Sequence, residues 1–255
     1  MTSLKDRLYL TTISPDAEET ARQFGLGLEI AEFCTAENMD VQFSKWDRVA
    51  RDKLKEAGAD RCVLHAPFYE LTPAAIDPLV LDVTKRRYRH AREIALSYGA
   101  RRMVVHSGFM PYVYFPEFFI ERSVLFYREF LDETPEDFTV LVENVLESNP
   151  DALVEIVRQV GDKRLRLCLD VGHANLMKQG ITLEEWLEKV LPFLGHAHLH
   201  NNHGKSDEHN PLGDGEIDMD RVMRRLLEGP GDATITIESR GSRTSMAWLQ
   251  ERGYL

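Results

Sequence analysis

Apolar and polar residues follow two alternating periods along this chain. Short runs with a two-residue period, typical of β-strands, are separated by longer amphipathic runs with the period of an α-helix. The expected strands cover residues 7–13, 26–33, 61–67, 102–108, 138–145, 165–172, 195–201 and 233–239. This regular succession predicts parallel strands joined by crossover helices.

The expected helices begin and end at local signals. Ser14 can cap a helix that stops at Gly25, and a helix over residues 43–57 ends at Gly58. Further helices are expected over residues 80–98, 117–131, 149–161, 182–191 and 219–227, and a last one runs through Trp248. Eight strand-helix units in 255 residues predict an α/β fold, a single (β/α)8 TIM barrel that forms one domain over residues 1–255.

Many of the expected strands end in a residue that can bind a metal ion. These residues are His65, His106, Glu143, Asp170, His198 and Glu238. Three more ligand-type residues follow shortly after two of these strands: His173, Asp207 and His209. Because parallel barrels carry their chemistry at the carboxyl ends of the strands, we expect all of these side chains to gather at one mouth of the barrel.

The parity of the strands points the same way. Side chains along a strand alternate between the barrel interior and the surrounding helices. In residues 165–171 the leucines share one parity and Asp170 has the other, while His196, His198 and His200 all face inward. Buried carboxylates and imidazoles are costly without partners, so the set is expected to be hydrogen-bonded internally, solvated at the mouth or bound to cations.

These residues resemble the xylose isomerase-like TIM-barrel superfamily (AP endonuclease family 2), which includes endonuclease IV and many sugar isomerases and epimerases. The strand-end ligands carry the resemblance, together with DVGH from Asp170 to His173 and DEHNPLGDG from Asp207 to Gly215. The resemblance implies one ion bound by His65, His106 and Glu143, a second by Glu143, Asp170, His198 and Glu238, and a third by His173, Asp207 and His209. Zinc suits such nitrogen and oxygen ligands best, and manganese or iron(II) also fits.

The ligands beyond the epimerase-type set of four favour a metal-dependent hydrolase. Two or three divalent ions would hold a hydroxide, formed with help from Glu143, for attack on a small phosphorylated, sugar-like or amide substrate. The alternative is a sugar or sugar-phosphate isomerase or epimerase that uses Glu143 and Glu238 as base and acid around one manganese-type ion. A DNA endonuclease acting at abasic sites is a third hypothesis.

Residues beside the ligands are candidates for binding the substrate. His200 lies at a strand tip, and Glu29 has the interior parity of the second strand, where it could bind a substrate hydroxyl. His203 and Lys205, in the glycine-rich loop after the seventh strand, could meet an anionic group. For each of these side chains the alternative is a plain polar lining or an exposed turn.

The composition narrows the class of partner. The net charge of −11 counts against broad, nonspecific nucleic-acid binding, and the compact loops favour a small-molecule substrate. No stretch approaches the roughly 18 apolar residues of a membrane span, which predicts a cytoplasmic protein without a membrane segment. Cys34, Cys62 and Cys168 lie in no C-x-x-C pair and are expected to be small buried thiols.

Overall fold

The computed structural model describes residues 3–255, in which the strands close into a parallel barrel. Strand β1 (Leu8–Thr11) pairs with β2 (Gly27–Ile30) on one side and with β8 (Thr234–Ile237) on the other. Between them lie β3 (Cys62–His65), β4 (Arg102–His106), β5 (Thr139–Glu143), β6 (Leu165–Asp170) and β7 (Leu194–Leu199). The predicted (β/α)8 barrel is therefore confirmed.

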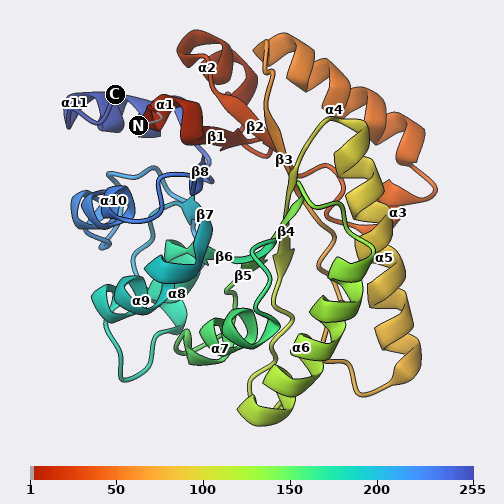
Figure 1. The fold of residues 1–255 in the computed structure, drawn as a ribbon. Helices are drawn as coiled ribbons and strands as arrows, with labels where there is room; N and C mark the ends of the chain where they lie inside the picture. The colour runs from red at the N-terminus through yellow and green to blue at the C-terminus, as the bar shows by residue number, and fades with distance from the viewer. Residues whose placement is uncertain (1–2) are drawn as a thin grey trace.

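Helices form an outer ring around the strands (Figure 1). The longer ones are α2 (Ala17–Phe24), α4 (Phe43–Ala57), α5 (Pro78–Ser97), α6 (Pro116–Asp132), α7 (Asp151–Val160), α9 (Leu183–Val190), α10 (Met219–Glu228) and α11 (Ser242–Glu251). Four short elements were not predicted: α1 (Leu4–Arg7), α3 (Ala36–Met39), α8 (Val171–Met177) and the 3-10 turn η1 (Leu191–Phe193). Within residues 3–255, none of the helices combines the length and the apolar character that crossing a membrane requires.

The apolar core has two layers, as the strand parity predicts. A small inner cluster fills the barrel and consists of Tyr9, Val63, Val104, Leu141 and Cys168. A much larger cluster lies between the strands and the helices and includes Leu167 and Leu169. Several inner-cluster residues precede a ligand-type residue by two positions on the same strand. The apolar residues inside the barrel thus lie directly below its polar mouth.

The start of α2 differs from the expectation. Ser14 does not cap this helix; its hydroxyl instead donates to Asp16 Oδ1 at 2.8 Å, and the helix begins at Ala17. The carboxylate of Asp16 accepts from the backbone N–H groups of Ser242 at 2.9 Å and Arg243 at 3.0 Å, at the start of α11. Asp16 therefore ties the β1–α2 loop to the last helix and helps to close the ring.

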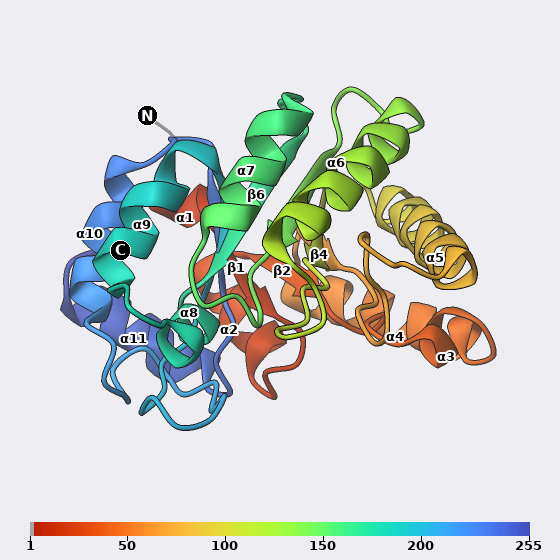
Figure 2. The ribbon, with the colours of Figure 1, turned by 90° about the horizontal axis from the view of Figure 1, so that it is seen from below.

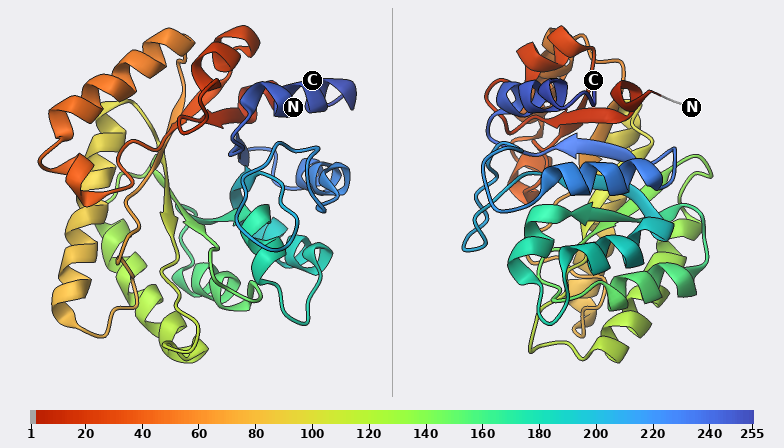
Figure 3. Two further views of the ribbon diagram at one scale, coloured as in Figure 1. Left: turned by 180° about the vertical axis from the view of Figure 1, so that it is seen from behind. Right: turned by 90° about the vertical axis from the view of Figure 1, so that its left-hand side faces the viewer.

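The sixth strand ends earlier than expected. Strand β6 stops at Asp170, and the residues expected to continue it begin α8. The Asp170 carboxylate accepts from the backbone N–H of His173 at 2.7 Å, which caps the helix and turns the chain. This turn brings α8 beside the segment between β7 and α10 at one end of the barrel (Figure 2). That segment projects furthest from the barrel in the right-hand view of Figure 3.

Candidate metal centre

Four of the predicted ligands meet at the carboxyl ends of neighbouring strands. We call Glu143, Asp170, His198 and Glu238 the deep group; each offers one ligand atom within 4.8 Å of the others. The Nδ1 atom of His198 lies 3.3 Å from Glu143 Oε1, 3.2 Å from Glu238 Oε2 and 3.8 Å from Asp170 Oδ2. All four side chains are buried. One imidazole nitrogen thus faces three carboxylates across a space of ionic size.

Unpartnered buried atoms show that these residues fit a metal ion. Within residues 3–255, His198 Nδ1 and Glu143 Oε2 are buried and have no hydrogen-bond partner. Such atoms cost about 1–3 kcal/mol each when nothing satisfies them. A divalent cation in the deep group would satisfy His198 Nδ1, and one on the side of His65 and His106 would satisfy Glu143 Oε2. A mixed set of nitrogen and carboxylate donors suits zinc, manganese or iron(II).

A second group lies on the other side of Glu143. His65 Nε2 and His106 Nε2 are 3.3 and 3.5 Å from Glu143 Oε2, whereas the Oε1 atom of the same carboxylate faces the deep group. His65 Nδ1 donates to the carbonyl of Ala66 at 3.0 Å, which leaves its Nε2 atom free to bind a metal. Glu143 is therefore placed to bridge the two groups.

The third predicted group, which we call the loop group, is assembled by α8 and the segment after β7. His173 Nε2 and His209 Nε2 lie 3.3 and 3.0 Å from Asp207 Oδ2. Their Nδ1 atoms donate to the carbonyls of Asn144 at 3.0 Å and Glu238 at 2.8 Å. Both imidazoles are thus oriented by the backbone, with their Nε2 atoms free to face an ion.

His200, predicted to contact substrate, lies within the loop group instead. It is fully buried, its Nε2 atom is 3.1 Å from Asp170 Oδ1, and its ring stacks on His209 at 4.0 Å. The ring covers Gly172, where an added Cβ would lie only 2.0 Å from it. His200 also belongs to the candidate ligand cluster with His173, Asp207 and His209. Strand parity correctly predicted that the His200 side chain faces inward, but it did not predict that the side chain is fully buried.

Glu29, predicted to bind a substrate hydroxyl, is buried beneath the mouth of the barrel. Its Oε2 atom accepts from His198 Nε2 at 3.2 Å and from His196 Nε2 at 3.1 Å. Burial raises the pKa of the Glu29 carboxyl, but His198 and His196 together hold it well below its usual value. Glu29 therefore lies behind the ring of His198 as a buried polar lining, which was the alternative expected for it, and a contact with substrate stays a prediction.

The remaining predicted substrate contacts stay outside the ligand groups. His203 is exposed, and its Nδ1 atom lies 2.8 Å from the Glu208 carboxylate. Lys205 is exposed in the same loop. The structure thus leaves both at the rim of the mouth, where a role toward an anionic substrate group stays a prediction.

Asn144 has a role that the sequence analysis did not find. Its side chain donates to the carbonyl of Asp170 and accepts from the backbone N–H of Asp170, each at 2.9 Å. This pair of hydrogen bonds joins β5 to the end of β6 and fixes the backbone of a deep-group ligand. The only available signal was its position directly after Glu143.

The carboxylates of the site favour protonated imidazoles. Burial opposes a charge on His209, yet Asp207 raises the pKa of this imidazole to about 9. Burial also opposes protonation of His173, but Asp170 and Asp207 hold its pKa well above the usual value. His106 differs, since burial lowers its pKa to about 4. The cluster requires compensating positive charge, which divalent ions would supply in place of protons.

Comparisons with known proteins identify the family. The sequence model of the xylose isomerase-like TIM barrel family matches residues 21–252. The chain belongs to this family. The predicted family membership is thereby confirmed.

The chain is also similar to several curated proteins. The uncharacterized protein MJ1311 of Methanocaldococcus jannaschii is 31% identical over 194 residues, which are 72% of this chain and 66% of that protein. The chain thus spans slightly less than two thirds of that relative. A probable endonuclease 4 of Mycobacterium tuberculosis is 22% identical over 74% of this chain and 77% of its own length.

Solved structures share the whole barrel. The TTHB071 protein of Thermus thermophilus, from a crystal soaked with ZnCl2, is 25% identical with a TM-score of 0.74 and covers 98% of both chains. A D-tagatose 3-epimerase-like protein is 23% identical with a TM-score of 0.72, over 97% of this chain and 96% of its own. At this identity the second likeness shows the fold alone.

Proposed function

We propose that this chain is a divalent-metal-dependent isomerase or epimerase that moves a proton on a small sugar-like substrate. The observation that carries the proposal is the placement of Glu143 and Glu238 in the deep group. They come from β5 and from the end of β8, and both carboxylates approach the Nδ1 atom of His198, at 3.3 and 3.2 Å. Two carboxylates from different sides of the barrel thus reach one small space.

This arrangement suits proton transfer beside a carbonyl group. An ion bound by the deep group would polarise the oxygen of the substrate. One glutamate would remove the proton from the adjacent carbon, and the other would deliver a proton to the second position or face. Because Glu143 is buried at 1% exposure, its carboxylate is shielded from bulk water, which strengthens its interaction with the reacting group.

The related structures support this choice over the hydrolase hypothesis. Besides the D-tagatose 3-epimerase-like protein, they include a D-psicose 3-epimerase and a 3-keto-D-glucoside 4-epimerase. These similarities indicate a shared fold but do not identify the substrate, since each structure is less than 25% identical to this chain. The proposal therefore rests on the deep group, and the comparisons make the isomerase or epimerase alternative the preferred one.

Two isotope labels separate the two kinds of chemistry. The purified protein, reconstituted with manganese or zinc, is incubated with a panel of ketoses and sugar phosphates in deuterated water and, separately, in oxygen-18 water. We expect deuterium to enter a carbon-bound position of the accepted substrate. Oxygen-18 in a cleavage product, without carbon-bound deuterium, would overturn the proposal in favour of hydrolysis.

A hydrolase with several ions is the second candidate, and the position of Glu143 favours it. The two oxygens of this carboxylate face different ligand groups, and the loop group offers a third position. Ions paired across Glu143 would supply an activated water as nucleophile. The similarity to a probable endonuclease 4 of Mycobacterium tuberculosis also supports this second candidate.

The zinc content of one variant tests this second candidate. Asp207 belongs only to the loop group and is 41% exposed, so Asp207→Asn is expected to fold normally. If several ions bind, elemental analysis gives two or three zinc ions in the unchanged protein and about one fewer in the variant. A single ion in both proteins would eliminate the multinuclear hydrolase and leave the deep group as the metal site.

A further inference from the structure

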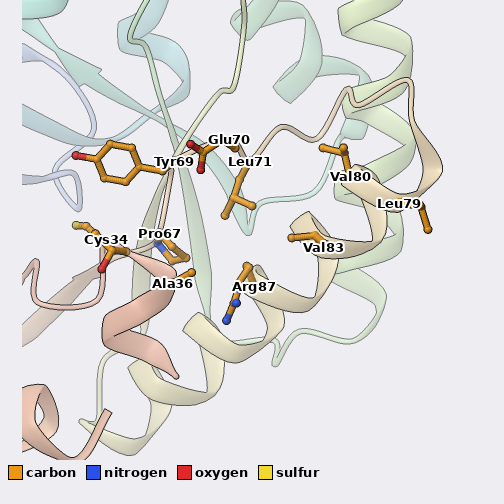
Figure 4. A pocket seen from close by; sticks show the side chains of 11 residues that line it. Cys34, Ala36, Pro67, Tyr69, Glu70, Leu71, Leu79, Val80, Val83 and Arg87 are labelled. Carbon is orange, nitrogen blue, oxygen red and sulfur yellow. The ribbon is translucent and has the colours of Figure 1, made fainter. Parts of the chain in front are cut away.

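An apolar groove lies beside the metal centre and takes no part in binding the ions. Its volume is about 570 Å³, within the range of small-molecule pockets, and it is lined mainly by apolar side chains that include Pro67, Leu71, Leu79, Val80 and Val83. The segment after β3 and the first turns of α5 form its walls, and Leu71 and Val83 face one another across it (Figure 4).

The groove adjoins the ligands of the metal centre at two points. Cys34, on its wall, has its Sγ atom 3.5 Å from His65 Nδ1. A second, smaller cavity of about 180 Å³ is lined by His106 itself, and Glu70 and Leu71 line both spaces. Cys34 meets the Nδ1 edge of His65, whereas the Nε2 atom of this ring faces Glu143, so the groove lies directly behind a ligand ring. The groove and the smaller cavity thus both adjoin the His65 and His106 side of the metal centre.

The charged groups of the groove define what can enter. Arg87 is already neutralised, since its guanidinium meets both oxygens of Asp40 at 2.7 Å. Glu70 has no hydrogen-bond or ion-pair partner in residues 3–255, and its backbone is held at φ 58°. The groove thus offers no free cation to a phosphate, whereas a neutral apolar group with a hydroxyl donor suits it.

We propose that the substrate carries an alkyl or aryl group, and that this group binds in the groove while the polar part binds at the metal centre. This inference rests on the proposed function, since it extends the sugar-like substrate to one with an apolar substituent. Burying each methylene group strengthens binding about fourfold. Occupancy of the groove would therefore select such substrates over simple free sugars.

A series of straight-chain alcohols tests the groove without any turnover. Binding of n-propanol to n-hexanol is measured by ligand-observed NMR, and the affinity is expected to rise about three- to fourfold per methylene. Val83→Glu places a charge in the groove and is expected to weaken n-hexanol binding at least tenfold. Val41→Glu is the matched control, because Val41 is 89% exposed and does not line the groove, whereas Val83 is 47% exposed. A flat series, or equal binding by both variants, overturns the proposal.

Paramagnetic relaxation tests whether the groove adjoins the metal centre. The protein is loaded with manganese or with zinc, with the loading verified by elemental analysis, and n-hexanol relaxation is compared. Faster relaxation in the manganese form, lost in Val83→Glu, is expected. Equal relaxation in both loaded forms contradicts the inference. If both groove experiments succeed while deuterium exchange fails, the proposed proton transfer is wrong and the apolar site stands.

Discussion

The buried carboxylate of Glu29 lies against Nε2 of His198, on the opposite side of the ring from the deep group. Because the carboxylate can only accept, it holds the ring proton on Nε2 and leaves Nδ1 free for a metal ion. Thr236 also donates to the same carboxylate oxygen. A residue from β2 thus sets the tautomer of a ligand on β7.

Glu29→Gln is expected to weaken metal binding without removing a ligand. The amide keeps the shape but loses the negative charge that favours the correct tautomer, so affinity is expected to fall about 10- to 100-fold. Competition with a chromophoric chelator measures the change. Glu32→Gln is the control, since Glu32 is also a buried glutamate but meets Thr12 and Lys53 instead. Equal affinity in both variants would mean that Glu29 does not orient His198.

Metal binding is expected to release protons. The carboxylates raise the pKa of His209 to about 9 and hold that of His173 well above its usual value, so both imidazoles carry protons near neutral pH in the metal-free protein. An ion must displace these protons, and its affinity therefore falls as the pH is lowered. Calorimetry in two buffers with different ionisation heats gives the number released. Zero proton release at neutral pH would contradict this charge compensation.

Gly172→Ala is expected to destabilise the protein although alanine is the better helix former. The added Cβ would lie 2.0 Å from the ring of His200. Displacing that ring breaks its contact with Asp170, at an expected cost of about 1–3 kcal/mol in the free energy of unfolding. Chemical denaturation measures the loss. Gly231→Ala is the control, because a Cβ there meets nothing within 4 Å; similar stabilities of the two variants would contradict the packing.

Asp16→Ala is expected to lower the free energy of unfolding by about 1–2 kcal/mol. Burial opposes ionisation, but hydrogen bonds from Arg243, Ser14 and Ser242 hold the pKa of Asp16 below its ordinary value of 3.8. The carboxyl pKa of Asp16 is lower in the folded protein than in the unfolded chain, so ionised Asp16 stabilises the fold at pH values above the ordinary pKa. This stabilisation is lost as the pH falls through the lowered pKa of the folded protein.

Denaturation of the unchanged protein and of Asp16→Ala over a range of pH checks this sign. The difference in stability between them should be constant above about pH 5 and shrink in stronger acid. Asp60→Ala, a change at a carboxylate that is 91% exposed, should alter stability by less than about 0.5 kcal/mol. A difference that grows in acid would contradict the role of Asp16.

The sequence predicted the barrel and the direction of its interior side chains because both follow from local periodicity. Position along the barrel axis does not follow from parity. Parity therefore predicted that Glu29 and His200 face inward but did not predict that both side chains are fully buried. The short helix α8 was not predicted because its N-cap is Asp170, the residue that also ends strand β6.

Long-range contacts also escaped sequence reasoning. The link between Asp16 and the start of α11 joins residues more than two hundred positions apart. The backbone of His209 adopts φ 51°, while its carbonyl accepts from the backbone N–H of Arg240 and its Nδ1 atom donates to the carbonyl of Glu238. No local pattern encodes such features, because they require the closed barrel.

The most direct measurement is an anomalous-scattering experiment at the metal edge on crystals of the protein grown with zinc or manganese. We predict a peak bonded to Glu143, Asp170, His198 and Glu238, with an occupancy that falls on Glu143→Gln. Fully ordered side chains at these four positions with no anomalous peak among them, in crystals that hold the metal elsewhere, would contradict a metal centre at the carboxyl ends of the strands.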